Sequence, residues 1–194
     1  KMAYYRLMRI QSSVILSLRD HNWCCVNGRF SAELFLTADH SETDLNAFIR
    51  IISLDGQEFL RQDFKGNFSC GTVKLADLAV KIPDSVLGNV ILTELKITSE
   101  KKIIFSDTLI YGVPDYKQVF NIPQAIISVA AIIESRKEGK HLRVILDNNN
   151  HIAALLVRLA IPEVPIETTY WKDNYVTLAP GECRQIECLW AAES

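Results

Sequence analysis

The side chains that could do covalent chemistry in this chain are few and scattered. Nucleophilic catalysis requires Ser, Thr or Cys beside a base, which is usually histidine. His21, His40 and His151 stand beside Asn, Asp or Ser in predicted turns, and His141 begins a predicted strand. The sequence contains no G-x-S-x-G elbow and no glycine-rich phosphate loop. We therefore expect solvated turn histidines and no catalytic residue.

Support in the sequence for a metal site or for a catalytic carboxylic acid is equally weak. Residues 147–150, D-N-N-N, offer oxygens that suit calcium, but no twelve-residue loop with a Gly and a closing Glu surrounds them. A polar turn is the preferred interpretation, so we expect no metal and no cofactor. Glu33 and Glu94 lie within predicted strands, and nothing marks either of them as an acid in a cleft. A solvated sheet face is the expected position of both carboxylates.

Three aromatic residues near the end of the chain are the more interesting candidates. They are Tyr170, Trp171 and Tyr175. Neighbouring aromatic rings on the edge of a β-sandwich can stack against a sugar ring. Trp and Tyr are also ordinary core residues, and packing is the preferred interpretation. Carbohydrate contact by these three residues is the alternative.

Composition excludes several protein classes. The chain has 194 residues, of which 48% are hydrophobic and 23% are charged, and this balance is typical of a folded protein. The formal net charge of −2 provides no field that would attract nucleic-acid phosphates. The longest apolar run, residues 125–133, is far shorter than the about 20 residues of a membrane helix. We therefore expect no nucleic-acid partner and no membrane span.

The five cysteines indicate neither a disulfide framework nor a zinc site. Their number is odd, Cys24 and Cys25 are adjacent, and no C-x-x-C pair occurs. Free cysteine behaves as a small hydrophobic residue, so we expect buried free thiols.

The elements that must position these residues are mostly β-strands. Residues 1–11 contain neither Gly nor Pro and place apolar side chains at helical spacing, which predicts the last turns of a helix. From Ser13 onward the hydrophobic period changes to two. The predicted strands of the first half cover residues 14–19, 30–38, 45–54, 58–64, 89–98 and 102–112. Residues 73–82 indicate an edge strand that Pro83 stops, followed by a short helical turn.

Turn signals separate these strands. Asn27-Gly28 marks one turn, and residues 99–101 form the loop of a predicted hairpin. Asp55-Gly56 marks another hairpin, in which both central residues should have positive φ.

The second half of the chain repeats the same pattern. Its predicted strands cover residues 125–135, 141–150, 152–161, 170–178 and 183–190. Short strands at this spacing, without alternating helices, are typical of antiparallel sandwiches. We therefore predict an all-β fold with two tandem antiparallel β-sandwiches after a short helix. The predicted parts are residues 1–12, 13–113 and 114–194; a single larger sandwich is the alternative.

Three stretches, taken together, resemble the C-terminal part of a family 2 glycoside hydrolase. Residues 1–18 are similar to the run that closes the (β/α)8 barrel of these enzymes and opens the next sandwich. Residues 23–45 and 50–59 are similar to the sandwich pattern of the family, with Ala38-Asp39-His40 where Asn-Asp is usual.

The third stretch is the most specific. Residues 170–190 resemble the run S-D-N-Y-F-T-L-L-P-G-E near the end of β-mannosidase-like and exo-β-glucosaminidase-like members. The residues that match are Asp173, Asn174, Tyr175, Leu178, Pro180, Gly181 and Glu182, whereas Lys172, Val176 and Ala179 depart from it. Pro180-Gly181 predicts a tight turn between two antiparallel strands. The side chains of Asp173 and Asn174 can bond neighbouring backbone amides and fix the preceding bend.

The resemblance implies immunoglobulin-like domains of a retaining exo-β-glycosidase that acts on terminal β-mannosides, β-glucosaminides or β-galactosides. In this family, two catalytic glutamates lie in the barrel, upstream of the stretch that matches, so no catalytic residue carries over. Residues 1–12 would be the remnant of the last barrel helix. The implied partners are the barrel and the N-terminal domains, and the implied location is periplasmic or secreted. A stand-alone carbohydrate-binding module and a partner-binding immunoglobulin-like sandwich remain the alternatives.

Overall fold

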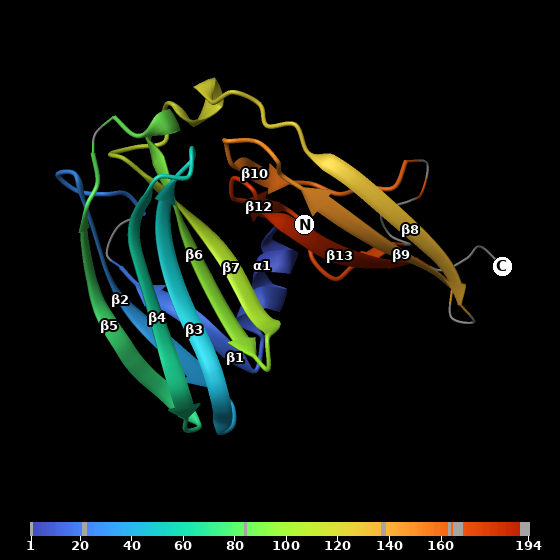
Figure 1. The fold of residues 1–194 in the computed structure, drawn as a ribbon, viewed down its shortest axis with the longest axis horizontal. Coiled ribbons are helices and arrows are strands. Elements are labelled where there is room, and N and C mark those ends of the chain that lie inside the picture. The colour runs from blue at the N-terminus through green and yellow to red at the C-terminus, as the bar shows by residue number, and fades with distance from the viewer. Residues whose placement is uncertain are drawn as a thin grey trace. The chain divides into compact units, whose positions relative to one another are not determined.

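The computed structural model describes residues 2–20, 23–83, 85–136, 139–162, 164 and 169–190. The chain divides into two units, one formed by residues 6–122 and the other by residues 1–5 with 123–194. Each unit contains a β-sandwich (Figure 1). We call the sandwich within residues 6–122 the first sandwich and the other the second sandwich.

Helix α1 (Met2–Ile10) precedes the strands. Its last turn closes where the backbone N–H of Gln11 donates to the carbonyl of Leu7, at 3.1 Å. The division between the two units falls within this helix, between Tyr5 and Arg6. The helix predicted from the first residues is therefore present.

The first sandwich combines a three-stranded and a four-stranded sheet. The three-stranded sheet has the order β1 (Val14–Arg19), β2 (Arg29–Ala38) and β5 (Gly71–Lys81). The four-stranded sheet has the order β4 (Glu58–Phe68), β3 (Glu42–Ser53), β6 (Val90–Ser99) and β7 (Lys102–Gly112). Alternate residues of both sheets share one core, for example Leu34 and Leu36 of β2 with Ile49 and Ile51 of β3.

Two short 3-10 helices complete the first sandwich, η1 (Leu87–Asn89) after β5 and η2 (Val119–Asn121) after β7. Strand β5 lies at the edge of its sheet and ends two residues before Pro83. Proline has no backbone N–H to donate to a neighbouring strand, which explains the stop. The edge strand and the helical turn after it are both as predicted.

Two turns of the first sandwich have both central residues in the left-handed region. Asn27 and Gly28 have φ values of 52° and 64°, and the residues on either side exchange backbone hydrogen bonds. Glu100 and Lys101, between β6 and β7, have φ values of 48° and 65°. Asn-Gly suits this type I′ geometry, whereas Glu-Lys adopts it without a favourable residue.

The hairpin at Asp55-Gly56 differs from its prediction. Only Gly56 has a positive φ, of 84°, so the expectation that both central residues would have one is wrong. The N–H of Gly56 donates to the carbonyl of Ser53, and the N–H of Ser53 donates to the carbonyl of Gln57. The loop is therefore one residue longer than a two-residue turn, and only its last residue must be left-handed.

The second sandwich has a four-stranded and a two-stranded sheet. The larger sheet has the order β11 (Thr169–Trp171), β13 (Cys183–Trp190), β9 (Gly139–Asp147) and β8 (Ser128–Arg136). The smaller sheet pairs β10 (Ala154–Val157) with β12 (Val176–Leu178). Their shared core includes Leu142, Leu146, Trp171, Leu178 and Ile186.

One predicted strand is much shorter than expected. Residues 152–161 were expected to form a strand, but only Ala154–Val157 do so. Leu156 has a φ of 51°, and the register of β10 shifts between its two ends. A left-handed residue turns the chain out of the extended conformation, so the segment after β10 leaves the sheet.

The all-β fold class is confirmed. All strand pairs in the described part of the chain are antiparallel, and they form the sheets of two sandwiches. No helix among the described residues has the length and apolar character that crossing a membrane would require.

Candidate functional site

A pocket with a volume of about 430 Å³ opens on the second sandwich. Its walls come from the start of α1, from the segment after β10, and from β11 and the bend that follows it. The lining includes Tyr4, Tyr5, Arg158, Trp171, Asn174 and Tyr175. Aliphatic side chains from the segment after β10 complete the lining, so the pocket is mainly apolar, with aromatic rings and a few polar groups.

Asn174 fixes one wall of this pocket. Its side chain is almost fully buried, and its Oδ1 accepts from the backbone N–H of Leu159 at 2.7 Å. Its Nδ2 donates to the carbonyl of the same residue at 2.9 Å. The N–H of Tyr175 also donates to Oδ1, and the N–H of Asn174 donates to Oδ1 of Asp173, each at 2.8 Å. Side-chain bonds to neighbouring backbone amides thus hold the bend, as the sequence led us to expect.

Three tyrosine rings form a series along the pocket. The ring centroids of Tyr4 and Tyr5 are 5.2 Å apart, and those of Tyr5 and Tyr175 are 6.1 Å apart. Burial raises the pKa of Tyr5, while a hydrogen bond with Asn174 opposes that rise. A hydrogen bond with Tyr170 raises the pKa of Tyr4. Both phenols are therefore neutral near pH 7 and can donate a hydrogen bond.

The three aromatic residues singled out in the sequence have different surroundings. Trp171 is 4% exposed and belongs to the core of the second sandwich. Tyr170 is 47% exposed and meets the pocket through its hydrogen bond with Tyr4. Tyr175 lines the pocket with a left-handed backbone, at a φ of 53°. Carbohydrate contact at these residues stays a prediction.

Sequence reasoning missed the other half of the pocket. Tyr4, Tyr5 and Arg158 lie far from residues 170–175 along the chain, and only the fold brings them together. The helical spacing of the first residues indicated a helix but gave no sign of what it would contact. Arg158 lies in the segment that was predicted as strand, so its place at a pocket had no local signal.

The Pro180-Gly181 turn connects β12 with β13. The N–H of Glu182 donates to the carbonyl of Ala179 at 3.1 Å, and Gly181 has the positive φ, 71°, that a type II turn requires. The carboxylate of Glu182 accepts from the N–H of Ala179 at 2.9 Å and from Arg184 at 2.6 Å. The two strands pair with other neighbours, β10 and β9. The turn therefore carries the chain between sheets, which differs from the hairpin that we expected.

Residues 147–150 form a turn around a buried amide. The side chain of Asn148 is fully buried, and its Nδ2 donates to the carbonyls of Ile152, Leu178 and Ala179, at 3.0, 3.2 and 3.0 Å. A buried amide needs such partners, and here they tie the turn at residues 148–152 to the end of β12. Within the described ranges, no group of three His, Cys, Asp or Glu could hold a metal ion.

A buried carboxylate holds α1 to the first sandwich. Asp107, on β7, lies 2.7 Å from Nη1 of Arg6 and 3.6 Å from Nη1 of Arg9, and its side chain is 4% exposed. Residues three apart in a helix share a face, so both arginines face the sheet. Leu7 and Ile10, by contrast, are about half exposed. A single Asp in an alternating strand carries no sequence signal, so this contact was not predicted.

The two glutamates considered as acids lie in different sheets of the first sandwich. Glu33 accepts hydrogen bonds from Lys74 and Arg19, which lower the pKa of its carboxyl. Glu94 is buried and pairs with Arg50, so the expectation that it would lie on a solvated face is wrong. The alternation of apolar and polar residues did not decide which face of the sheet Glu94 would occupy. The ion pair with Arg50 lowers the cost of burying its charge. Neither carboxylate lies in a shared cleft with the other.

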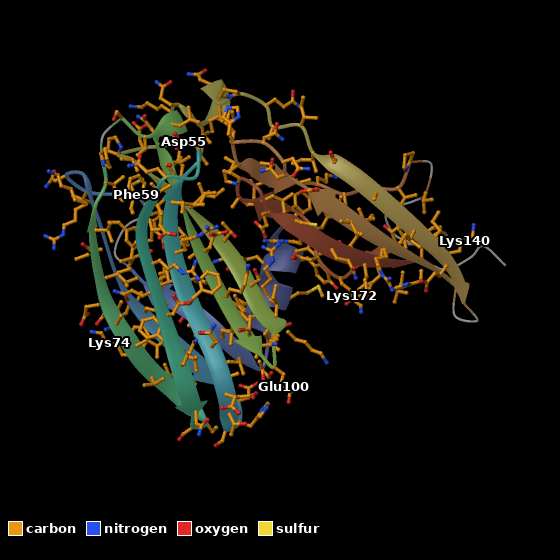
Figure 2. All side chains as sticks on the ribbon, viewed as in Figure 1. Asp55, Phe59, Lys74, Glu100, Lys140 and Lys172 are labelled. Atoms are coloured by element: carbon orange, nitrogen blue, oxygen red, sulfur yellow. The ribbon has the colours of Figure 1, made fainter. Side chains whose placement is uncertain are left out.

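The histidines show no assembled catalytic pair among the described residues. His40 and His151 are exposed, and His21 lies outside the described residues. His141 is 4% exposed, with Nε2 lying 3.5 Å from Glu187. Lys172 (labelled in Figure 2) lies 2.6 Å from the same carboxylate and lowers the pKa of Glu187. His141 thus lies beside the ion pair of Glu187 and Lys172 on this sheet.

The cysteines are all free, but the expectation that they would be buried is only partly correct. Cys25 and Cys188 are buried, Cys24 is intermediate, and Cys70 and Cys183 are exposed. Burial raises the pKa of the Cys25 and Cys188 thiols to about 11. The exposed thiols lie near strand ends, where the alternating pattern no longer decides burial.

Comparison with known proteins identifies the fold. The crystal structure of the exo-chitosanase CsxA from Amycolatopsis orientalis matches with a TM-score of 0.77 and 17% identity, over 98% of this chain and 25% of that chain. A β-D-mannosidase from Dictyoglomus thermophilum matches with a TM-score of 0.63 and 16% identity, over 97% of this chain and 21% of that chain. Likeness at such low identity concerns the fold alone. A search of curated proteins gave no match.

The chain spans about a quarter of the length of that exo-chitosanase. Its residues 106–194 match a family model described as the exo-β-D-glucosaminidase Ig-fold domain. That stretch contains the Asp173-Asn174 bend and the Pro180-Gly181 turn on which the resemblance was based. The resemblance to the immunoglobulin-like domain of exo-β-glucosaminidases is thereby confirmed for residues 106–194, and the likeness of the rest of the chain to these enzymes concerns the fold.

Proposed function

We propose that this chain is the non-catalytic C-terminal part of a family 2 glycoside hydrolase, and that it holds the catalytic barrel in position. The whole enzyme would remove terminal β-linked sugars with retention, and β-glucosaminides are the substrates that the family match favours. β-Mannosides and β-galactosides are the alternatives. The two domains would act through contacts with the barrel and the N-terminal domains.

The observation that carries this proposal is that helix α1 turns its charged side chains toward the sheet and leaves apolar side chains exposed. Its charged side chains, Arg6 and Arg9, face the buried Asp107, whereas Leu7 and Ile10 are 49% and 50% exposed. A surface helix normally buries its apolar side and exposes its charges. An apolar side left exposed fits a helix with a second apolar neighbour. A barrel that contains this helix would supply that neighbour.

The distribution of acidic side chains supports a role outside the chemical step. Retaining hydrolysis needs two carboxyl groups about 5–5.5 Å apart at one sugar. Glu33 and Glu94 lie in separate sheets, and each is held by a basic partner. The aromatic pocket of the second sandwich includes a guanidinium and phenols but no carboxylate among the described residues that line it.

A hydrolysis assay tests the proposal. The purified 194-residue chain is incubated with the p-nitrophenyl β-glycosides of glucosamine, mannose and galactose, beside the intact A. orientalis exo-chitosanase as a positive control. We expect no release of nitrophenol by the chain. Hydrolysis that remains after rigorous purification contradicts the non-catalytic role.

The coding sequence upstream of Lys1 provides a second test, because it should encode a barrel with two catalytic glutamates.

A second candidate function is carbohydrate binding at the aromatic pocket. Its support is the series of Tyr4, Tyr5 and Tyr175 beside Arg158, because flat rings with a few polar groups suit the apolar face and hydroxyls of a sugar. Titration calorimetry with chitosan and mannan oligosaccharides measures it. Tyr4→Ala should abolish any heat of binding, whereas Phe120→Ala, which changes a ring that is 92% exposed in the first sandwich, should not. No binding heat with the unchanged chain contradicts this function.

A further inference from the structure

Strand β8 leaves one edge of its sheet open. It is the last strand in the order β11-β13-β9-β8, and it pairs with β9 in an unbroken antiparallel register from Ser128 to Arg136 (Figure 1). The backbone groups that point away from β9 have no strand partner in the described part of the chain. An open edge of this length accepts a further strand unless the sequence prevents it.

Over residues 128–133 the side chains of β8 do nothing to prevent such pairing, and its charged residues, Glu134 and Arg136, lie at its end. Val129 is 62% exposed, Ile132 is 49% exposed and Ile133 is 62% exposed. Ala130 and Ala131 are exposed as well, so apolar side chains occupy both faces of the strand. Edge strands are usually protected by Lys, Pro or a bulge, and residues 128–133 contain none of these. An apolar edge of this kind indicates an interaction surface.

The order of these residues identifies the partner. We propose that β8 pairs with β8 of a second copy of this chain, antiparallel, with Ala131 opposite Ala131. In this register Val129 lies opposite Ile133, and Ala130 lies opposite Ile132. Ser128 lies opposite Glu134, so each polar end meets a polar end. Two-fold symmetry requires the same strand to fit itself, and this strand does so without opposing like charges.

The neighbouring symmetric registers fit less well. Centring the pair on Ile132 places Glu134 opposite Ala130, and centring it on Ala130 places Glu134 opposite Ile126. Each of these puts a carboxylate against an apolar side chain. A shift by a single residue would also turn every side chain to the opposite face. Among these three registers, only the one centred on Ala131 places Glu134 opposite a polar residue, Ser128, and keeps residues 129–133 opposite apolar residues.

The resulting dimer has one continuous sheet of eight strands across the two copies. The joined edges bury less area than the about 800 Å² per partner of a standard interface, so we expect a reversible dimer. Sedimentation velocity from about 1 to about 300 µM covers the range in which such weak interfaces associate. We expect the 21.9 kDa chain to shift to twice that mass as its concentration rises. A chain that remains monomeric throughout overturns the proposal.

Charge substitutions at the self-paired position test the register. Ala131→Lys and Ala131→Glu each place two like charges opposite one another in the dimer, so each variant alone should remain monomeric. Mixing the two variants opposes Lys to Glu and should restore the dimer. Val73→Lys, on the exposed edge strand β5, is the matched control and should leave the dimer unchanged.

Circular dichroism verifies that the variants fold. If Ala131→Lys does not fold, Val129→Lys provides a second test of the same interface. A dimer that persists in both folded variants overturns the proposal, because it must use another surface. Failure of the mixed Lys and Glu variants to associate overturns the register.

Discussion

The two sandwiches differ in how completely they bury their sheets. Among the described residues, the core of the first sandwich has twenty-three buried side chains, whereas that of the second has nine. The first sandwich has two sheets of three and four strands, but the smaller sheet of the second has only two. Strand β8 is exposed over most of its length as a result. The same alternating sequence pattern therefore supports a closed core in one place and an incomplete one in the other.

The difference indicates where each sandwich obtains its stability. The first can lose one apolar contact and retain many, because buried residues from six of its seven strands share its core and partly buried residues of β4 pack against it. The second depends on one large ring, Trp171, and on buried amides, Asn148 and Asn174, that tie irregular segments together. We expect the second sandwich to unfold first, and three substitutions and one change of pH test that expectation.

The largest effect should come from Trp171→Ala. Removing a buried Trp from a small core costs about 3–5 kcal/mol. The second sandwich should therefore unfold at a much lower urea concentration while the first is unchanged. Fluorescence of Trp190 alone, in a Trp23→Phe background, and of Trp23 alone, in a Trp190→Phe background, follows the two sandwiches separately. Tyr170→Ala changes the exposed neighbour of Trp171 and should cost less than about 1 kcal/mol. Equal effects of the two substitutions would mean that Trp171 has no special role in the core.

Asp107→Asn should have the next largest effect, and in the first sandwich. It removes the carboxylate that holds Arg6 and Arg9, and we expect a loss of about 2–3 kcal/mol in the free energy of unfolding. Asp115→Asn breaks an exposed pair with Lys117 and should have a much smaller effect, because water and salt screen such a pair. Urea titration of both variants compares them. A loss no larger than that of Asp115→Asn would show that α1 is not held by this carboxylate.

Alkaline pH should weaken both sandwiches to a similar degree. Burial raises the pKa of Cys25, in the first, and of Cys188, in the second, to about 11. An unfolded thiol titrates near pH 8.5, so between about pH 8.5 and 11 the unfolded state loses protons that the folded state keeps, and stability falls by about 1–2 kcal/mol per thiol. Cys25→Ala and Cys188→Ala should each flatten this fall, measured by urea unfolding at several pH values. Cys70→Ala, at an exposed thiol, should leave it unchanged.

The smallest effect should be a gain in the first sandwich. Glu100 (Figure 2) and Lys101 adopt the left-handed conformation that Asn-Gly prefers. Replacing both residues by Asn and Gly should raise the free energy of unfolding by about 1 kcal/mol, because strain at these positions is relieved. Thermal unfolding measures the gain. A lower melting temperature would contradict the left-handed geometry of the turn.

Strand alternation made most of the fold predictable. Strand β1 begins and ends where the pattern of residues 14–19 indicated, and β13 matches residues 183–190. The hydrophobic period decides which residues face a core, and Pro83 and the Asn27-Gly28 turn mark where strands end. The short β10 was not predictable, because the left-handed Leu156 is imposed by the fold rather than by its own sequence.

The candidate sites were predictable only where the chain is locally continuous. The bend at Asp173 and the turn at Gly181 follow from short-range bonds between a side chain and nearby backbone. The pocket joins Tyr5 to Tyr175, and the helix contact joins Arg6 to Asp107, across long stretches of sequence. The hydrophobic periodicity of one segment does not indicate which distant residues that segment will contact. Such contacts emerge only from the folded arrangement.

The buried amide of Asn148 also bears on the chemical ageing of the protein. Deamidation requires the side-chain carbonyl carbon to swing toward the next backbone nitrogen, and three carbonyl acceptors hold this amide in place. Asn149, which is exposed, donates through its amide to a single side chain, the carboxylate of Asp147 at 2.8 Å. If Asn148 did convert to Asp, an oxygen would replace a nitrogen that donates to three carbonyls, and attraction would become repulsion where the turn meets residues 178–179. Burial and three hydrogen bonds thus protect the second sandwich from deamidation at the position where the change would disturb its packing most directly.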